Sequence, residues 1–542
     1  MIRSYPGRYR RSDSSRPIRH GRVGSLALLL LVFDLTACSR FPAVDLAPSY
    51  QPAEFVVPAS WHGASPFVEA NPSDGELRAD WWKLYNDPIL NKLEEQAMVV
   101  NPDLQAAAER FVQARDAMMK ARSQYIPRVG LGFDASDNRA SLNHLFLAPG
   151  ISLEQSSVVA GGLASWEPDF WSALRNATRV EIYRAEERAA DYGLARLSLQ
   201  AEIASNYFTL RAFDAQIAIY AQTIAYYKQS LEIVHMQFVG KIASALDVAR
   251  AESLLFSTET KKAQIEGLRQ VTEQSIAILL NMAPASFSIE PVNDLLRVAK
   301  FTIPQTLPST LLERRPDIAA MERQMAQANR AIGIARAAFY PNVSFRAGGG
   351  FEDAGLNLIT LANSFWSYGA TVSLPLFQGG YRRAQLQQSW SAYRETEDRY
   401  RSTVLNAFRE VENNLSMTNR LTVASNRQEA AVGATQKTQS LSMELYTGGL
   451  ISSLDLIYAQ LNTLTARIDS VQIKAELLRS SVALIRALGG GWNRNQLPAD
   501  EQIQPFGTFQ YTNLDKPRPA GGIDVNADNN RIHNDLTKPL VP

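Results

Sequence analysis

The chain has 542 residues, too many for one ordinary core and enough for two or three domains. Its 55 Lys and Arg residues are mixed with 54 Asp and Glu residues, which gives a formal net charge of +1. Because no basic stripe stands out, a nucleic acid is a poor candidate partner. Beyond the first forty residues there is no run of eighteen apolar residues, so we expect no membrane-spanning helix in the mature protein.

The N-terminus has the features of an export signal. Arginines are frequent in residues 1–22, an apolar run extends from Val23 to Phe33, and small residues follow. A basic segment, a short apolar run and small residues before a cleavage point are typical of a secretory signal peptide. We therefore predict a signal peptide over 1–37.

Cys38 is the only cysteine of the chain, so it cannot form an internal disulfide and needs another explanation. The run Leu35–Cys38 resembles the bacterial lipobox, in which the cysteine is diacylated and becomes the mature N-terminus. Ser39, in place of an aspartate, resembles the outer-membrane sorting pattern. The resemblance implies lipidation of Cys38 and a lipidated N-terminal segment over 38–80. The alternative is a plain signal peptide followed by an unused thiol.

Two copies of one unit follow. The segment Asn101–Leu104 recurs as Arg315–Ile318, 214 residues later, and Leu246–Val248 recurs as Leu454–Leu456, 208 residues later. Chance similarity would not keep the order and spacing of such markers over about 180 residues, so the sequence contains an internal duplication.

These markers define the domain organisation. We predict a first repeat over 81–284, a linker or equatorial segment over 285–310 and a second repeat over 311–492. Residues 493–542 are rich in Asn, Asp, Pro and Gly. This composition predicts a polar, mostly disordered tail.

Each copy is predicted to contain a helix, a pair of strands, a very long helix, a tight turn and a second helix. In copy one the first helix begins after Asp87, an N-cap carboxylate before a proline, and runs to about Gln124. In copy two it extends over about Leu311–Ala338. Pro127 and Pro341 end these helices, since proline disfavours helix in the residue before it.

Strand-like segments follow those prolines. Val129–Phe133 and Val343–Ala347, with the returning segments Ser157–Trp166 and Phe365–Leu374, alternate by side-chain size and polarity. Alternation with period two is the weak signature of a membrane β-strand. The alternative is four strands of a soluble sheet.

The remaining segments have a heptad pattern. Apolar residues recur in 4-3 spacing from Leu199 to Phe238 and from Leu454 to Ile485, which predicts left-handed coiled-coil packing. The long helices over 173–237 and 380–445 would each reach about 95 Å. Since this is about three times the hydrocarbon thickness of a bilayer, they must project into an aqueous space.

The same 4-3 spacing in the second long helix selects smaller and more polar residues: Val404, Ala407, Val411, Asn414, Thr418, Leu421, Ser425, Gln428 and Val432. One interpretation is a surface helix with a shifted seam. The other is that the second hairpin lines a water-filled lumen while the first packs outside it.

Four strands cannot close on themselves, and an open edge in lipid leaves backbone groups unpaired at several kcal/mol each. Only a closed barrel removes the edge. If the strands lie in a membrane, several chains must therefore pool them, although this reasoning does not fix their number.

The duplicated layout resembles the TolC-like outer-membrane efflux proteins, and most closely their lipid-anchored NodT/OprM branch. The motifs that carry the resemblance are Asp80–Leu90, Arg315–Ile318, Ala335–Pro341, Leu374–Gly380 and Tyr446–Asp455, and together they extend from about Trp81 to Trp492. The resemblance implies a mainly α-helical homotrimer, with a twelve-stranded β-barrel on a twelve-helix coiled-coil tunnel. It also implies a lipid-anchored location in the outer membrane, with the helices extending into the periplasm.

The same resemblance implies partners and an activity. The partners are a periplasmic adaptor and an inner-membrane pump, most often of the resistance-nodulation-division class. The activity is passive conduction of small molecules, such as drugs and toxic solutes, to the exterior, with no catalytic site and no cofactor.

Two tight turns are the candidate functional sites. Gly240 in copy one, and Gly448 with Gly449 in copy two, are expected to permit the turns because glycine accepts positive φ. In the family this turn touches the adaptor, so these glycines and Asp247 are candidate adaptor contacts. Asp455 lies just past the second turn, and three copies around an axis would form a carboxylate ring that gates a constriction. The alternative is a helix-capping role, as Asp247 has in copy one.

Enzyme signatures are lacking. The sequence has no H-E-x-x-H, C-x-x-C, P-loop or nucleophile elbow, and its five histidines are scattered, so we expect no catalytic, metal or cofactor site. Two alternatives to a small-molecule duct stay open: a type I protein-secretion duct and a non-conducting, periplasm-spanning structural lipoprotein. The paired strand segments favour a duct over the structural lipoprotein.

Overall fold

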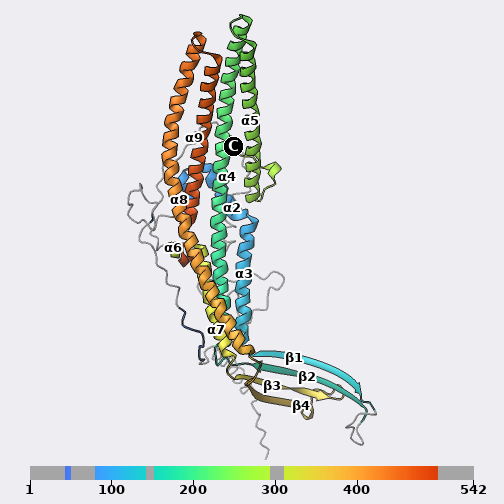
Figure 1. Cartoon of the computed structure of the whole chain (residues 1–542). Coiled ribbons are helices and arrows are strands. Elements are labelled where there is room, and N and C mark those ends of the chain that lie inside the picture. The colour runs from blue at the N-terminus through green and yellow to red at the C-terminus, as the bar shows by residue number, and fades with distance from the viewer. Residues whose placement is uncertain (1–42, 51–60, 62–79, 142–151, 293–310, 498–542) are drawn as a thin grey trace, which may run out of the picture. The chain divides into compact units, whose positions relative to one another are not determined.

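The computed structural model describes residues 43–50, 61, 80–141, 152–292 and 311–497. The predicted signal peptide, Cys38 and most of the predicted tail lie outside these residues. The chain divides into two units, one containing the four strands and the other containing most of the helices (Figure 1). Each unit is described by itself below.

The first helix of each copy is interrupted, which corrects the prediction of one continuous helix. After the 3-10 turn η3 (Trp81–Tyr85), copy one has α2 (Pro88–Val100) and α3 (Pro102–Arg122). Copy two has α6 (Leu311–Arg314) and α7 (Pro316–Ala337). The interruption falls before a proline in both copies, because proline disfavours a helical residue ahead of it. One of the repeated motifs that reveal the duplication, Asn101–Leu104 and Arg315–Ile318, therefore lies at a helix break in both copies.

The strands form one antiparallel sheet in the order β1-β2-β3-β4. They are β1 (Arg128–Arg139), β2 (Glu154–Trp166), β3 (Asn342–Asp353) and β4 (Ser364–Ser373). Three predicted strand segments lie within strands, and the fourth extends one residue, Leu374, beyond β4. Copy one supplies β1 and β2, copy two supplies β3 and β4, and β2 pairs with β3 across the copies. In the described part of the chain, β1 and β4 are the two edges.

The register separates apolar from polar side chains. Directly paired residues share a face, so Leu131 opposite Gly162, Trp166 opposite Phe345 and Ala347 opposite Tyr368 all belong to one face. That face collects the apolar and aromatic side chains of all four strands: Val129, Leu131, Phe133, Val158, Trp166, Val343, Phe345, Phe351, Trp366, Tyr368 and Val372. We call it the apolar sheet face. The opposite face is mostly Gly, Ser, Thr and charged residues, with Val159, Leu163 and Phe365 as exceptions.

Two long helices and two shorter ones complete the copies. The long helices are α4 (Ala173–Val239) and α8 (Tyr381–Thr447), each of 67 residues, and the shorter ones are α5 (Ala245–Leu279) and α9 (Ser453–Ala487), each of 35 residues. At 1.5 Å per residue each long helix extends about 100 Å. Among the described residues, no helix combines the length and the apolar character needed to cross a bilayer.

The 4-3 positions of α8 pack mostly against the chain's own helices, so the interpretation as a surface helix with a shifted seam is wrong. The other interpretation, that the second hairpin lines a water-filled lumen, stays a prediction. Val404 and Val411 are fully buried. The Thr418 and Ser480 hydroxyls hydrogen-bond at 2.8 Å, and Gln428 Nε2 donates to the Ala466 carbonyl of α9 at 3.0 Å. The polar residues are therefore part of the α8–α9 contact, and a lumen-facing surface of α8 must be a different face.

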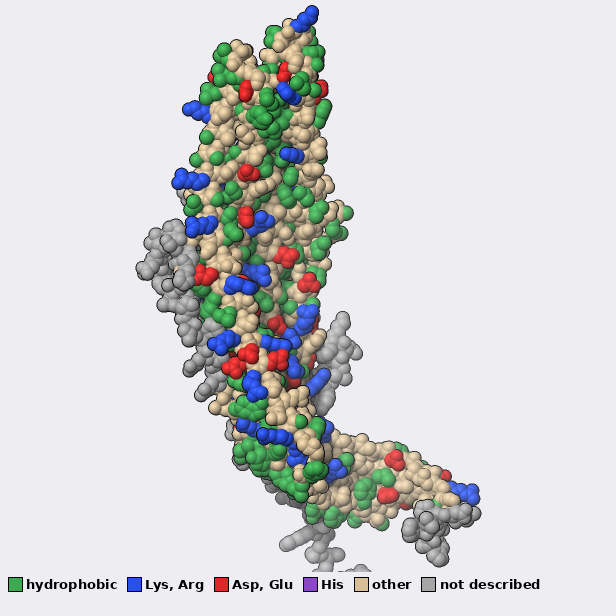
Figure 2. Space-filling view, viewed as in Figure 1, with side chains coloured by type: hydrophobic (Ala, Val, Ile, Leu, Met, Phe, Trp, Pro, Cys, Tyr) green, Lys and Arg blue, Asp and Glu red, His purple; other side chains and the backbone are tan. Residues whose placement is uncertain are grey.

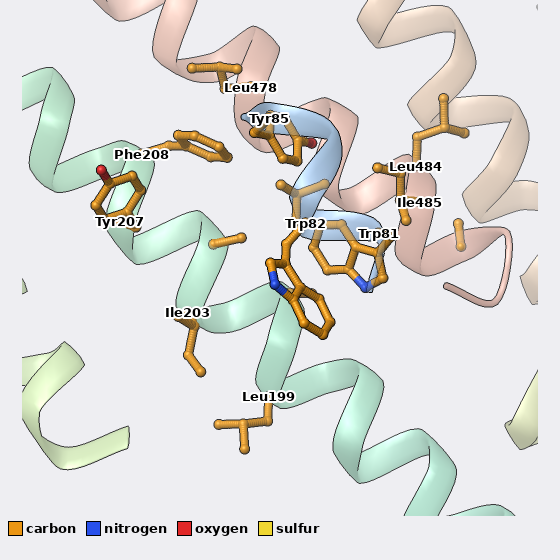
Figure 3. Close-up of a cluster of buried hydrophobic side chains, with 14 of the residues drawn as sticks. Trp81, Trp82, Tyr85, Leu199, Ile203, Tyr207, Phe208, Leu478, Leu484 and Ile485 are labelled. Carbon is orange, nitrogen blue, oxygen red and sulfur yellow. The ribbon is translucent and has the colours of Figure 1, made fainter. Parts of the chain in front are cut away.

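The main core joins both copies around the Trp81–Tyr85 turn (Figure 3). Trp81, Trp82 and Tyr85 are buried against Ile203 and Phe208 of α4. The Trp81 indole N–H donates to Gln200 Oε1 at 3.3 Å, and the Tyr85 and Ser481 hydroxyls hydrogen-bond at 2.8 Å. The N-terminal turn therefore ties α4 of copy one to α9 of copy two.

Candidate functional site at the helical tips

The two hairpins end in turns of the same construction. The first tip (240–244) joins α4 to α5, and the second tip (448–452) joins α8 to α9. In the first tip the N–H of Ile242 donates to the Gln237 carbonyl and that of Lys241 to Phe238. The second tip repeats both bonds 208 residues later, from Leu450 to Leu445 and from Gly449 to Tyr446. This pair of bonds is the Schellman motif that ends many helices.

The glycine prediction is right at one position and wrong at two. The left-handed residue of the motif is Gly449 (φ 76°) in the second tip and Lys241 (φ 61°) in the first. Gly240 and Gly448 do not have positive φ, and a Cβ at either position would make only ordinary van der Waals contact. The repeated glycine lies one residue before the strained position, which sequence spacing alone does not reveal.

Asp247 and Asp455 are confirmed as helix-capping residues. Ser244 is the N-cap of α5, and its backbone N–H donates to Asp247 Oδ2 at 3.0 Å while the Asp247 N–H donates back to Ser244 Oγ. Ser452 and Asp455 form the same reciprocal capping box at the start of α9. The capping role does not exclude a pore role for Asp455, because its side chain is exposed.

The two aspartates differ in what else they contact. Asp247 Oδ1 accepts a hydrogen bond from Ser453 Oγ of the other hairpin. The hydrogen bonds from Ser453 and Ser244 lower the pKa of Asp247 below its usual value, so the carboxylate stays ionised. Asp455 has no such bond to the first hairpin among the described residues. The two copies are therefore structurally unequal at the tips: Asp247 joins the hairpins, whereas Asp455 remains open to solvent.

A second contact joins the hairpins just behind the turns. The Tyr446 hydroxyl of α8 donates to Gln237 Oε1 of α4 at 2.7 Å. Tyr446 also packs with Val234 and Leu456 in a small buried cluster. No local sequence pattern pairs residues about 200 positions apart, so the cross-hairpin roles of Tyr446, Gln237 and Ser453 were not predicted.

The ends of both tips expose apolar side chains. Ile242 is 81% exposed in the first tip and Leu450 is 74% exposed in the second, and Val239, Leu246 and Tyr458 lie close by along the chain. Exposed apolar side chains grouped in this way mark a surface for association. The tips therefore combine a fixed backbone with an apolar surface.

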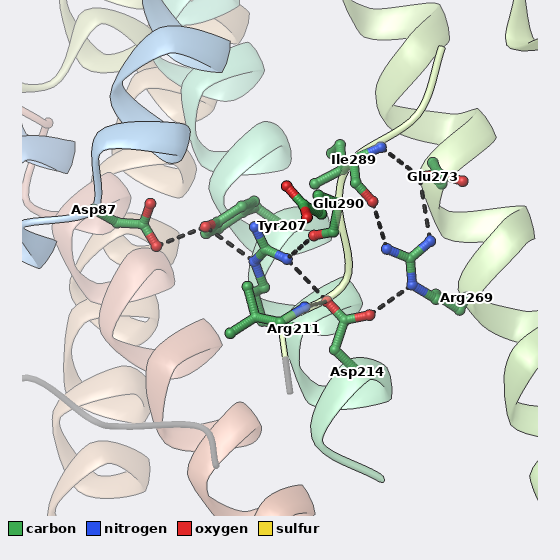
Figure 4. A network of polar contacts seen from close by, with 9 residues as sticks. Asp87, Tyr207, Arg211, Asp214, Arg269, Glu273, Ile289 and Glu290 are labelled. Atoms are coloured by element: carbon green, nitrogen blue, oxygen red, sulfur yellow. Dashed lines mark hydrogen bonds and ion pairs between the residues drawn. The ribbon is translucent and has the colours of Figure 1, made fainter. Parts of the chain in front are cut away.

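Farther along the helices, a buried network of charges holds the segment that follows α5 (Figure 4). Asp214 accepts from Arg211 Nη1 at 2.9 Å and from Arg269 Nε at 2.6 Å. Arg211 and Arg269 also donate to the backbone carbonyls of Glu290 and Ile289 at 2.8 and 2.7 Å. This network fixes the start of the predicted linker against α4 and α5.

On one face of the helical unit, charges of both signs are mixed (Figure 2). On the face drawn in Figure 2, Lys and Arg side chains alternate with Asp and Glu along the helices. Within the described ranges, no group of three or more His, Cys, Asp or Glu side chains is placed to hold a metal ion.

Comparisons with known proteins agree with this geometry. The family model described as outer membrane efflux protein matches residues 93–282 and 307–490. The probable efflux pump outer membrane protein TtgC of Pseudomonas putida is 28% identical over 484 residues, covering 88% of this chain and 97% of the relative. The pyoverdine export outer membrane protein OpmQ of Pseudomonas aeruginosa is 28% identical over 475 residues, covering 85% of this chain and 97% of the relative. The solved outer-membrane channel OprN superposes with a TM-score of 0.76 at 26% identity, covering 82% of this chain and 99% of OprN.

The chain belongs to the outer membrane efflux protein family. It is the outer-membrane channel component of an efflux system, as the resemblance implied. The prediction of a mainly helical chain with a few strands, built from two copies of one unit, is also confirmed.

Proposed function

We propose that three copies of this chain pool their strands in one twelve-stranded barrel and their helices in one tunnel, which passively conducts small solutes across the outer membrane. The observation that carries the proposal is the sheet, which has one apolar face and two open edges. Leu131 is 91% exposed and Tyr368 is 80% exposed on the apolar sheet face. In water such a face would drive aggregation, whereas in lipid it is stable if the edges are paired.

Closure between chains satisfies both requirements. If β1 of one chain pairs with β4 of the next, every strand gains two neighbours and no edge remains. The apolar sheet face then points to the lipid and the polar, glycine-rich face lines the channel. Aromatic side chains such as Trp366 and Tyr368, whose rings stack at a centroid distance of 5.6 Å, are suited to the membrane interface.

The tips are the proposed contact with a periplasmic adaptor, which connects the duct to an inner-membrane pump of the resistance-nodulation-division class. The apolar side chains of Ile242 and Leu450 support this role, because they offer area to bury against a partner. Asp455, exposed beside the second tip, would form a ring of three carboxylates in the trimer, and such a ring favours cations at a constriction.

The membrane anchor is proposed to be lipid attached to Cys38. One acyl chain binds a membrane reversibly, whereas two or more give a stable anchor. Cys38→Ser should abolish metabolic labelling by palmitate. If the labelling persisted, the lipid would be attached elsewhere and this part of the proposal would be wrong.

Cross-linking between strand edges tests the trimer. Gly132→Cys on β1 and Gly369→Cys on β4 lie on the same sheet face, and a side chain at either position meets nothing within 4 Å. A short thiol-reactive cross-linker should join the double variant into dimers and trimers, and nothing larger. Each single variant and the unmodified chain, which retains Cys38, are the controls and should stay monomeric on a denaturing gel.

Planar-bilayer recording tests conduction. The purified protein should open discrete channels that need no energy source. An absence of channels together with an absence of cross-linked trimers would refute the duct and favour the structural lipoprotein.

A further inference from the structure

A cavity of 290 Å³ lies where α4, α8 and α9 meet, away from the tips and from the charge network. In Figure 1, α9 runs between α8 and α4. The cavity is lined by Gln222 and Tyr226 of α4, Gln439 and Ser440 of α8, and Thr463 and Arg467 of α9, among others. At about 30 Å³ per water it holds roughly ten waters or one small organic molecule.

Arg467 is the only charged side chain in the lining of this cavity. Its Nη2 donates to Gln222 Oε1 at 2.7 Å, which is a neutral partner. In the described part of the chain, no carboxylate lies within ion-pair distance of it. Partial burial lowers the pKa of the Arg467 guanidinium, with no carboxylate to raise it again.

Three more deeply buried arginines of the same unit have carboxylate partners. Arg211 and Arg269 pair with Asp214 at 2.9 and 2.6 Å, and Arg315 pairs with Glu410 at 2.8 Å. Arg467 is only partly buried, so it loses part of its solvation free energy, and a neutral amide restores this loss less well than an anion would. Arg467 therefore lacks the type of partner that its counterparts have.

Apart from Leu464, the other lining residues have neutral polar side chains, and several of them are hydrogen-bonded. Burial raises the pKa of Tyr226, and hydrogen bonds with Gln439 and Gln460 hold its hydroxyl. Gln460 Nε2 also donates to Ser230 Oγ at 3.3 Å. Amides and hydroxyls are suited to hydrogen bonding with the hydroxyl, carbonyl or amide groups of a ligand.

We propose that this cavity binds a small polar organic anion, whose carboxylate or phosphate group pairs with Arg467. The planar guanidinium offers two parallel N–H donors to either group, and such bidentate pairs are among the strongest hydrogen bonds in proteins. The neutral wall binds the polar remainder of the molecule. The inference concerns a single chain and does not depend on the number of chains in the duct.

Titration calorimetry on the purified full-length protein in detergent, in low-chloride buffer, tests the proposal with succinate and inorganic phosphate as probes. We expect saturable binding of at least one probe at one site per chain. Arg467→Gln should weaken it about ten- to a hundredfold, which is the usual effect of losing a charged hydrogen bond. Arg479→Gln is the matched control, because it removes the same charge from an exposed position on α9 and should leave binding unchanged.

A second variant tests the cavity apart from the charge. Ser440→Trp puts a large side chain at the cavity wall and keeps Arg467, so it should also abolish binding. Succinate binding without phosphate binding identifies a carboxylate ligand, and the reverse identifies a phosphate ligand. If neither probe binds, or if Arg467→Gln binds as tightly as the unmodified protein, the proposal is overturned. Channel recordings are a separate measurement, so failure here leaves the proposed duct untouched.

Discussion

Asp214→Asn is the most informative single change, because one carboxylate neutralises two buried arginines. The Asp214 side chain is 1% exposed, and its two oxygens accept from Arg269 and Arg211 (Figure 4). Asparagine has nearly the same shape but no charge, so the substitution removes the ion pairs with little change in packing. Both guanidiniums then stay buried beside a neutral amide.

The expected cost is large. Removing one partner of a buried ion pair typically destabilises a protein by about 3–5 kcal/mol, because the remaining charge is left without compensation. Glu273 still pairs with Arg269 at 3.2 Å, so we expect the loss in free energy of unfolding to lie near the lower end of this range, at about 3 kcal/mol. For a large domain this corresponds to a fall in melting temperature of about 5 °C or more.

The loss of stability should be greatest in the segment that follows α5. Arg211 and Arg269 hold the backbone carbonyls of Glu290 and Ile289, so the segment after α5 should loosen before the helices melt. Circular dichroism gives the melting temperature, and hydrogen exchange of residues 287–292 gives the local effect. Asp398→Asn, at an exposed position of α8, is the control. If Asp214→Asn melts like this control, and its segment exchanges at the unmodified rate, the reasoning about buried charge is refuted.

Three further predictions concern other parts of the helical unit. Burial raises the pKa of Glu94 well above its ordinary value, and neither of its oxygens has a hydrogen-bond partner among the residues that the structure describes. As the pH rises, the Glu94 carboxyl group loses its proton in the unfolded chain before it does so in the folded protein. Below the ordinary pKa the group is protonated in both states. Above that pKa the unfolded state is favoured, so the protein loses stability as the pH rises toward the folded-state pKa. Between about pH 5 and pH 8, the melting temperature of Glu94→Gln should therefore fall less than that of the unmodified protein. Equal falls in the two proteins would contradict this prediction. Gly489→Ala should destabilise by more than about 1 kcal/mol in thermal melts, because φ is +92° and the new Cβ would lie 2.2 Å from the Arg314 carbonyl oxygen. Gly433→Ala, inside α8 with open space around it, should instead be neutral or stabilising by up to about 1 kcal/mol. Tyr446→Phe removes the bond to Gln237 and should weaken the contact between the hairpins by about 0.5–1.5 kcal/mol, seen as faster hydrogen exchange at the tips. Tyr458→Phe, at an exposed position of α9, is the control, and its tips should exchange hydrogen at the rate of the unmodified protein. Equal exchange rates in the two variants would show that the bond between Tyr446 and Gln237 does not stabilise the hairpin contact.

The sequence by itself determined the local structure of this protein. Prolines located the ends of the first helices, although not the breaks within them; period-two alternation located the strands, and the aspartates after the tip turns indicated helix caps. Each of these signals acts over a few residues, so it is legible without knowledge of the fold. The duplication could be recognised for a related reason, because similar short motifs recur at a nearly constant spacing along the chain.

Only the tertiary structure decided how equivalent positions differ. The capping boxes at Asp247 and Asp455 read alike in sequence, yet only Asp247 accepts a bond from the opposite hairpin. The polar 4-3 positions of α8 suggested a surface helix with a shifted seam, but they pack on α9, where the Thr418 and Ser480 hydroxyls hydrogen-bond. Arg467 has no sequence signature at all. In each case the deciding partner is distant along the chain, and hydrogen bonding and desolvation depend on which groups meet in space.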